Sequence, residues 1–154
     1  MRAPIDAMRY FEDFKPGEVA ELGRHTISRD EIIAFGRQFD PQIFHVDEEA
    51  ARQTIFGGLI ASGWHTGSLA MRLFCDGVIK DTASLGSPGI DEMRWIKPVR
   101  PGDTLSLRMT VTDCVPSRSK PDRGIVHSIL ELSNQHGEVV VSIKGMNLIR
   151  RRPA

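Results

Sequence analysis

The sequence predicts an α+β fold in which a curved antiparallel sheet wraps around one long helix. In the first half of the chain, apolar residues recur at helical spacing. After Ser84 they alternate with polar residues, which is the period of strands, and turn residues separate the alternating segments. Helices followed by successive strands are typical of α+β domains. A length of 154 residues fits one such domain, which we expect to span residues 1–154.

The helical half follows a short extended segment at 18–27, and its helices are expected at 29–39, 48–53 and 63–77. Ser28 and Glu31 have the spacing of a capping box, which favours a helix start at this point. Pro41 disfavours helical geometry at the residue before it, so the first helix should end near Asp40. Asp47 is a suitable N-cap for the second helix.

The third helix is predicted to be the longest and to form the main core helix. It should begin near Ser62 and Gly63, after the glycine pair at 57–58 has interrupted the preceding pattern. Its buried stripe is expected to consist of apolar residues at helical spacing, namely Leu69, Leu73 and Phe74.

Strands are predicted at Met93–Val99, 104–111, Ile125–Asn134 and Glu138–Ile149. Residues 104–111 alternate strictly, which places every second side chain on the same face of a strand. The sequence Gln135-His136-Gly137 is a plausible turn that would join the last two strands as a hairpin. The segment 116–124 is too rich in proline, glycine and charge to be a strand interior.

Composition excludes several classes of partner. Lys and Arg number 20, as do Asp and Glu, so no net charge favours nucleic acid or an anionic membrane. No apolar run is long enough for a transmembrane helix, and the N-terminal segment lacks the apolar centre of a signal peptide. Cys75 and Cys114 form no closely spaced pair, so a reducing, cytoplasmic setting is expected.

Asp40 and His45 are the first candidate for catalytic chemistry. They lie five positions apart in the link between two predicted helices, among the apolar residues Phe39, Ile43 and Phe44. A carboxylate and an imidazole that share one water can remove a proton from it and return one. Burial would raise the pKa of the aspartate, whereas a protonated histidine beside it would lower that pKa. Spacing alone favours a structural role, in which Asp40 caps a turn and His45 packs in the core.

Gly63 supplies a second candidate group, its backbone N–H. The first N–H groups of a helix have no partner within the helix and lie at the positive end of its dipole. Such a group can stabilise a carbonyl oxygen that becomes negative during a reaction. The structural alternative is that Ser62 is only an N-cap and Gly63 only a packing residue.

The runs FDPQIFHVDEEAA, FGGLIASGWH and SPGIDEMRWIKPVRPGDTL together resemble the MaoC-like acyl dehydratases. This family of hotdog-fold proteins includes the (R)-specific enoyl-CoA hydratases, and the resemblance extends from about Tyr10 to Arg150. The family pattern of aspartate, histidine, aspartate and helix glycine matches Asp40, His45, Asp47 and Gly63.

Two departures from the family pattern lie close to these matched residues. In the hydratases, Asn-Pro is followed by one residue and then the histidine. In this chain, Pro41 comes directly after Asp40, and Gln42-Ile43-Phe44 precede His45. Many hydratases also have a histidine where this chain has Ser62. The departures leave the identity of the substrate more open than the type of reaction.

The resemblance implies a hydratase or dehydratase that acts on a 2-enoyl or 3-hydroxyacyl thioester. Asp40 and His45 would activate a water for addition at C3 and would exchange the proton at C2. The N–H of Gly63 would stabilise the enolate-like oxygen. Neither a metal nor a redox cofactor is required, and coenzyme A would enter only as part of the substrate. The acyl carrier would be coenzyme A or an acyl carrier protein, and a homodimer or larger homo-oligomer is expected.

Further residues are candidates for substrate binding. Ser62, Trp64 and His65 flank Gly63 in sequence, although for His65 a packing role is favoured over a catalytic one. The cationic residues of the later loop, together with Arg94, are suited to the phosphates of coenzyme A, but a solvated loop explains them equally well. These loop residues are Arg118, Lys120 and Arg123. No close pair of histidines supports a metal site.

Two other functions remain open at this point. A hotdog thioesterase would need a carboxylate or serine aimed at the thioester carbonyl, often from the central helix. Residues 63–75 contain neither Asp nor Glu, which counts against this function. A non-catalytic module that binds acyl thioesters is the third possibility, because the residues between Asp40 and His45 differ from the hydratase pattern.

Overall fold

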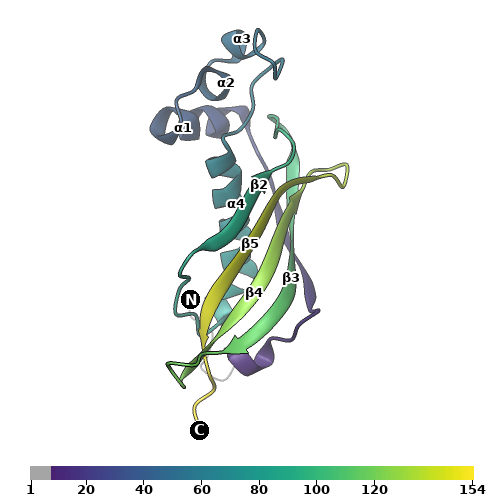
Figure 1. Ribbon diagram of the computed structural model, residues 1–154. Coiled ribbons are helices and arrows are strands. Elements are labelled where there is room, and N and C mark those ends of the chain that lie inside the picture. The colour runs from purple at the N-terminus through teal and green to yellow at the C-terminus, as the bar shows by residue number, and fades with distance from the viewer. Residues whose placement is uncertain (1–7) are drawn as a thin grey trace.

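A computed structural model describes residues 8–154, so residues 1–7, part of the segment assessed for a signal peptide, lie outside it. Five antiparallel strands form one sheet in the order β1-β3-β4-β5-β2. The sheet curls around helix α4, as Figure 1 shows, which confirms the predicted α+β class. The strands are β1 (Val19–Thr26), β2 (Ile90–Trp95), β3 (Thr104–Pro116), β4 (Arg123–Ser133) and β5 (Val139–Arg150). No helix within residues 8–154 is long and apolar enough to span a bilayer.

The helices are α1 (Arg29–Phe39), α2 (Ile43–Val46), α3 (Glu48–Ala51) and α4 (Gly63–Gly77), with short 3-10 helices η2 (Phe11–Asp13) and η3 (Ile79–Asp81). The first three helices form a group beyond one end of the sheet, at the top of Figure 1. Helix α1 has the predicted bounds and a complete capping box, in which the Glu31 N–H donates to Ser28 Oγ at 3.1 Å. Asp47 caps α3 through the N–H of Ala50, at 3.0 Å.

The core lies between α4 and the inner face of the sheet. The alternation predicted for β3 is confirmed, because Leu105, Leu107, Met109 and Val111 are all buried. The turn between β4 and β5 is confirmed as well. It is closed by the Asn134 N–H on the Glu138 carbonyl at 2.9 Å, and Gly137 takes the positive φ of 75° that this turn requires.

The predicted stripe of α4 packs in or against the core, and small residues that were not predicted extend the buried face. Leu69 and Leu73 are only partly buried, and the fully buried positions include the small residues Gly67 and Ala70 beside Phe74. A methyl group added at Gly67 would lie 2.9 Å from Cε of Met93 in β2. The helix axis therefore lies close to the sheet, and small residues at the contact make this approach possible.

Several element boundaries also differ from the expectation. Helix α2 was not predicted, because four residues are too few to show a helical period. Helix α3 ends at Ala51 rather than at residue 53. Strand β2 ends at Trp95 instead of continuing to Val99, and β3 extends past residue 111 after a bulge.

Replacing Ala70 by leucine should destabilise the fold. Ala70 is fully buried where α4 meets the sheet, so the larger side chain must displace packed neighbours. We expect Ala70→Leu to lower the free energy of unfolding by about 1–3 kcal/mol, measured by urea denaturation. Met71→Leu, at an exposed position one residue along, is the matched control and should change it little. An unaltered stability of Ala70→Leu would contradict the close helix–sheet contact.

Candidate active site

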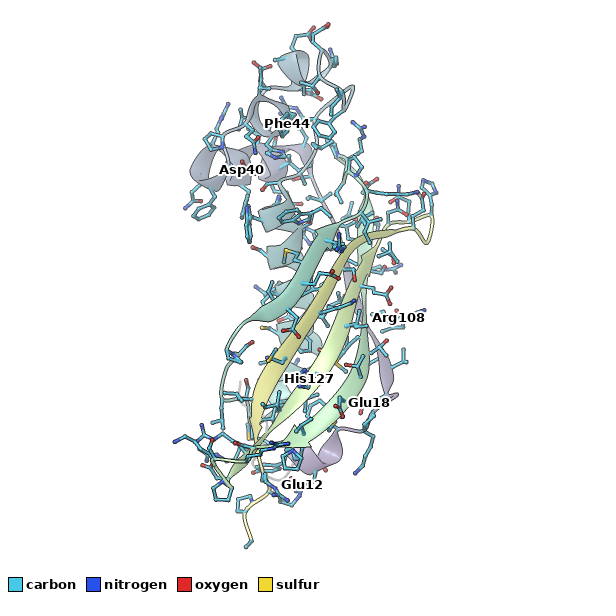
Figure 2. The ribbon with its side chains drawn as sticks, in the orientation of Figure 1. Glu12, Glu18, Asp40, Phe44, Arg108 and His127 are labelled. Carbon is cyan, nitrogen blue, oxygen red and sulfur yellow. The ribbon has the colours of Figure 1, made fainter. Side chains whose placement is uncertain are left out.

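A cavity of about 410 Å³ lies where the first turn of α4 meets the α1–α2 link and the chain after β2. This size is within the usual range of small-molecule sites. Most of its lining is apolar or aromatic and includes Phe44, Phe56, Ile60, Trp64, Trp95 and Ile96. Gly63 lines the same cavity, whose polar side chains are few: Asp40, Gln42, His45, Thr66 and Lys97. Figure 2 labels Asp40 and Phe44 in this helical end of the molecule.

His45 is held rigidly by its neighbours. It is buried, and its Nδ1 lies 2.7 Å from the carbonyl oxygen of Ile60. Because a carbonyl can only accept a hydrogen bond, Nδ1 carries the proton that is donated. Gly36 lies so close that an added methyl group would be 3.0 Å from Cβ of His45, which fixes α1 against α2. In neutral His45 the lone pair is therefore on Nε2.

Asp40 faces this lone pair. Its Oδ2 is 3.2 Å from His45 Nε2 and also accepts a hydrogen bond from Ser62 Oγ at 2.7 Å. Its Oδ1 accepts one from Gln42 Nε2, also at 2.7 Å. Burial acts to raise the pKa of Asp40, but the hydrogen bonds from Gln42 and Ser62 and the charge of protonated His45 outweigh it, so that this pKa is lowered. Asp40 is therefore a carboxylate at neutral pH.

The backbone N–H of Gly63 has no acceptor among residues 8–154. The next three N–H groups of α4 are all satisfied by Ser62: Trp64 by its Oγ, and His65 and Thr66 by its carbonyl. Gly63 is thus the one residue of this turn whose N–H is available, and it lines the cavity. An oxygen of a bound molecule can accept from it.

The indole of Trp95 rests directly on Gly63. A Cβ atom at position 63 would collide with the Trp95 ring, so the glycine is required by a close approach of a side chain. Trp64 meets Trp95 edge to face, with ring centroids 5.5 Å apart. The two indoles form an aromatic wall beside the free N–H.

Comparison with known proteins places the chain in a family. A family model described as a MaoC like domain matches residues 13–134. The chain belongs to the MaoC-like domain family. It is 35% identical to an (R)-specific enoyl-CoA hydratase of Rhodospirillum rubrum over 117 residues, which are 72% of this chain and 75% of that protein. It is also 34% identical to the Bacillus subtilis protein YdeM over 139 residues, covering 86% of this chain and 97% of that one.

Solved structures agree with this assignment. The crystal structure of a MaoC-like dehydratase from Rhodospirillum rubrum matches with a TM-score of 0.85 at 41% identity, over 95% of this chain and 99% of that chain. A Mycobacterium tuberculosis protein described as a double hotdog fold matches with a TM-score of 0.80 at 16% identity, over 96% of this chain and 46% of that chain. The hotdog fold expected from the sequence is thereby confirmed for this MaoC-like domain.

The MaoC-like domain brings together some of the residues singled out from its sequence. Asp40, His45, Gly63 and Trp64 share the cavity, while Ser62 lies fully buried behind it and contacts Asp40. His65 does not line the cavity.

Instead, His65 stacks on Phe35, with ring centroids 4.7 Å apart and planes inclined by 6°. It is buried there, so the packing role favoured for it is the one that its surroundings support.

The expected phosphate-binding residues do not join this site within one chain. Arg118 and Lys120 lie in the β3–β4 connection, and Arg123 is the first residue of β4. Beside it, the Asp122 carbonyl accepts from the Arg151 N–H, and the Arg151 side chain pairs with Glu12. Figure 2 labels Glu12 at the end of the molecule opposite Asp40. Arg123 pairs with Asp122, and Arg94 pairs with Glu92.

Many residues that line the cavity were not singled out from the sequence, and four of them are central to the site. Gln42, Ile60, Trp95 and Lys97 line the cavity, and Lys97 forms an ion pair with Glu138 of the turn before β5. The only sequence signal near them was the unusual composition of the link after Pro41, which pointed to Gln42. Within residues 8–154, no three His, Cys, Asp or Glu side chains come together as metal ligands would.

Acidification should destabilise the protein through His65. Desolvation lowers the pKa of this buried histidine below its usual 6.5, and its Nδ1 has no hydrogen-bond partner among residues 8–154. Below about pH 6.5 this histidine is protonated in the unfolded chain but stays neutral in the folded protein. The free energy of unfolding therefore falls as the pH falls. We expect His65→Phe to weaken this pH dependence between about pH 7 and 5, measured by urea denaturation at each pH. An unchanged pH dependence would show that other groups cause it.

Proposed function

We propose that this MaoC-like domain catalyses the addition of water to 2-enoyl thioesters and the reverse dehydration of 3-hydroxyacyl thioesters. One observation carries the proposal: Asp40, His45 and the free N–H of Gly63 line a single, mostly apolar cavity. The names of the relatives support it. Besides the (R)-specific enoyl-CoA hydratase, they include a 3-hydroxybutyryl-CoA dehydratase of Methylorubrum extorquens, at 26% identity over 87% of this chain and 83% of that protein.

The acid–base pair suits the activation of water. Neutral His45 presents a lone pair on Nε2 and Asp40 presents carboxylate lone pairs, so both groups accept hydrogen bonds. A water that sits beside the pair, within reach of both groups, donates a hydrogen to each, which directs a lone pair of its oxygen toward C3 of the enoyl group. As the C–O bond forms, the pair takes up the water proton, and the same pair supplies the proton that is added at C2.

The backbone N–H of Gly63 is available to stabilise the negative charge that develops on the substrate. Attack at C3 moves electrons onto the thioester carbonyl oxygen, which becomes enolate-like. The unpaired N–H of Gly63 donates to that oxygen at the positive end of α4. In other enzymes, the loss of one such donor raises the barrier by about 3 kcal/mol.

The cavity lining favours an uncharged acyl group. Its largest side chains are aromatic or aliphatic, and its one cationic residue, Lys97, is paired with Glu138. The substrate would carry coenzyme A or an acyl carrier, and we infer that no metal or redox cofactor takes part. A hydration adds the elements of water across a double bond and changes no net oxidation state.

We also propose that the protein is a homodimer that pairs through β2. This strand lies at the edge of the sheet, and β5 is its one neighbouring strand among residues 8–154. Its edge and the adjacent face of α4 expose large apolar side chains: Trp64, Met71, Ile90 and Trp95 are each about half exposed or more. Trp64 and Met71 are seven positions apart on α4 and so lie on one face. An apolar edge of this kind pairs readily with a second copy of itself.

A paired assay tests the activity. The protein is given crotonyl-CoA and longer or branched enoyl-CoAs, and the loss of enoyl absorbance is followed together with the release of free thiol. Hydration predicts loss of absorbance without thiol release. Release of thiol with the alkene intact would instead indicate a thioesterase. Absence of both signals over a broad panel would favour a non-catalytic acyl-binding module.

The variants Asp40→Asn and His45→Gln should each lower kcat at least about 100-fold, because each removes one half of the acid–base pair. Their thermal unfolding should remain close to that of the parent protein. Glu49→Gln, at an exposed position of α3, is the control and should keep full activity. Substantial turnover by either site variant would refute the assigned roles.

Dimerisation through β2 predicts that Ile90→Lys shifts the protein toward monomers, because it places a charge on the apolar edge. Val19→Lys is the matched control: Val19 is equally exposed but lies on β1, at the other edge of the sheet. Sedimentation velocity measures both. A dimer that Ile90→Lys leaves intact, or that Val19→Lys dissociates, would place the interface elsewhere.

A further inference from the structure

Asp40 is held by hydrogen-bond donors on both of its oxygens. Gln42 Nε2 donates to Oδ1 and Ser62 Oγ donates to Oδ2, each at 2.7 Å. His45 Nε2 lies 3.2 Å from the same Oδ2. Neither donor belongs to the acid–base pair itself, and Gln42 is an exposed side chain that has no packing reason to be fixed. Gln42 and Ser62 thus both donate to the Asp40 carboxylate.

The backbone brings the two donors to Asp40 from different parts of the chain. Asp40 is the C-cap of α1 and Gln42 is the N-cap of α2, with Pro41 between them. The Gln42 N–H also donates to the Asp40 carbonyl at 2.8 Å. Ser62 approaches from the start of α4, 22 residues further along the chain. It is fully buried and does not line the cavity, so any effect it has on a bound molecule passes through Asp40 or Gly63.

The chemistry of both donors favours the charged form of Asp40. The Ser62 hydroxyl has a single hydrogen, and its oxygen already accepts from the Trp64 N–H at 3.2 Å as the cap of α4. The amide nitrogen of Gln42 can only donate. If Asp40 were protonated, one of its oxygens would carry the proton and would be a poorer acceptor. The hydrogen bonds from Gln42 and Ser62 would then be weaker than those to a carboxylate.

We propose that Gln42 and Ser62 are positioning residues that clamp Asp40 as a permanent carboxylate, so that His45 alone exchanges protons with the substrate. This inference rests on the proposed function. In the catalytic cycle the water proton passes to His45 Nε2 while hydroxide adds to C3, and the imidazolium returns a proton to C2. Asp40 stabilises that imidazolium across 3.2 Å and keeps its own charge throughout.

The clamp is tested first without any substrate. Aspartate labelled with ¹³C at the carboxyl carbon reports the titration of each side chain by NMR, and the Asp40 signal is the one missing from Asp40→Asn. Gln42→Ala and Ser62→Ala each remove a donor to the carboxylate, so the Asp40 titration should move to higher pH in both. Gln38→Ala, an exposed glutamine of α1 with no side-chain hydrogen bond to residues 8–154, should leave it in place.

Loss of the helix cap needs its own control, since Ser62→Ala also removes the N-cap of α4. Ser28→Ala removes the corresponding cap of α1 without touching Asp40. If Ser28→Ala moves the Asp40 titration as far as Ser62→Ala does, the effect belongs to helix capping and the clamp is refuted. Gln42→Ala caps no helix with its side chain, so it tests the clamp even if Ser62→Ala folds poorly.

Kinetics then test the link to catalysis. Losing one hydrogen bond to the charged carboxylate should lower kcat about tenfold, with KM changing less than about twofold. In Gln42→Ala and Ser62→Ala, the decrease of kcat/KM at acidic pH should show a second ionisation. It arises because Asp40 then takes up a proton within the pH range of the assay. Unchanged profiles together with an unmoved NMR titration would overturn the proposal. An inactive parent protein would overturn the proposed function, while the NMR result would still decide whether the clamp exists.

Discussion

The hydrogen bond between His45 Nδ1 and the Ile60 carbonyl is the contact on which the rest of the site depends. It joins α2 to the segment that leads into α4, and so it sets the distance between the imidazole and Gly63. It also leaves the lone pair of Nε2 facing Asp40. Without this contact the imidazole could turn, and the three groups that line the cavity would no longer share one orientation toward a bound molecule.

Two ionisable groups in this region have lowered pKa values for opposite reasons. Asp40 is stabilised in its charged form by donors that outweigh the effect of burial. His65, two residues beyond Gly63, is kept neutral by burial against Phe35, where its Nδ1 has no partner among residues 8–154. The start of α4 thus has a fixed negative charge on its cavity side and an uncharged ring on its packed side.

Local patterns in the sequence were sufficient for much of the fold. The capping box at Ser28 gave the bounds of α1, and the alternation along β3 gave its buried face, because both depend on neighbours within a few residues. The stripe predicted for α4 was confirmed, because Phe74 is in the core and Leu69 and Leu73 pack against it, but the small residues Gly67 and Ala70 at the contact with the sheet were not foreseen. The bond from Ser62 to Asp40 spans 22 residues, and no local pattern records it.

The site itself was predictable only in part. Asp40, His45 and Gly63 were recognised by residue type and family pattern, but cationic character alone could not place the β3–β4 loop at the far end of the molecule. The contact of Trp95 with Gly63 has a further consequence. Asp40 and His45 come from the α1–α2 region, whereas Trp95 comes from an edge strand, β2. A change of side chain at this one strand position can therefore alter the shape of the cavity while Asp40 and His45 keep their places.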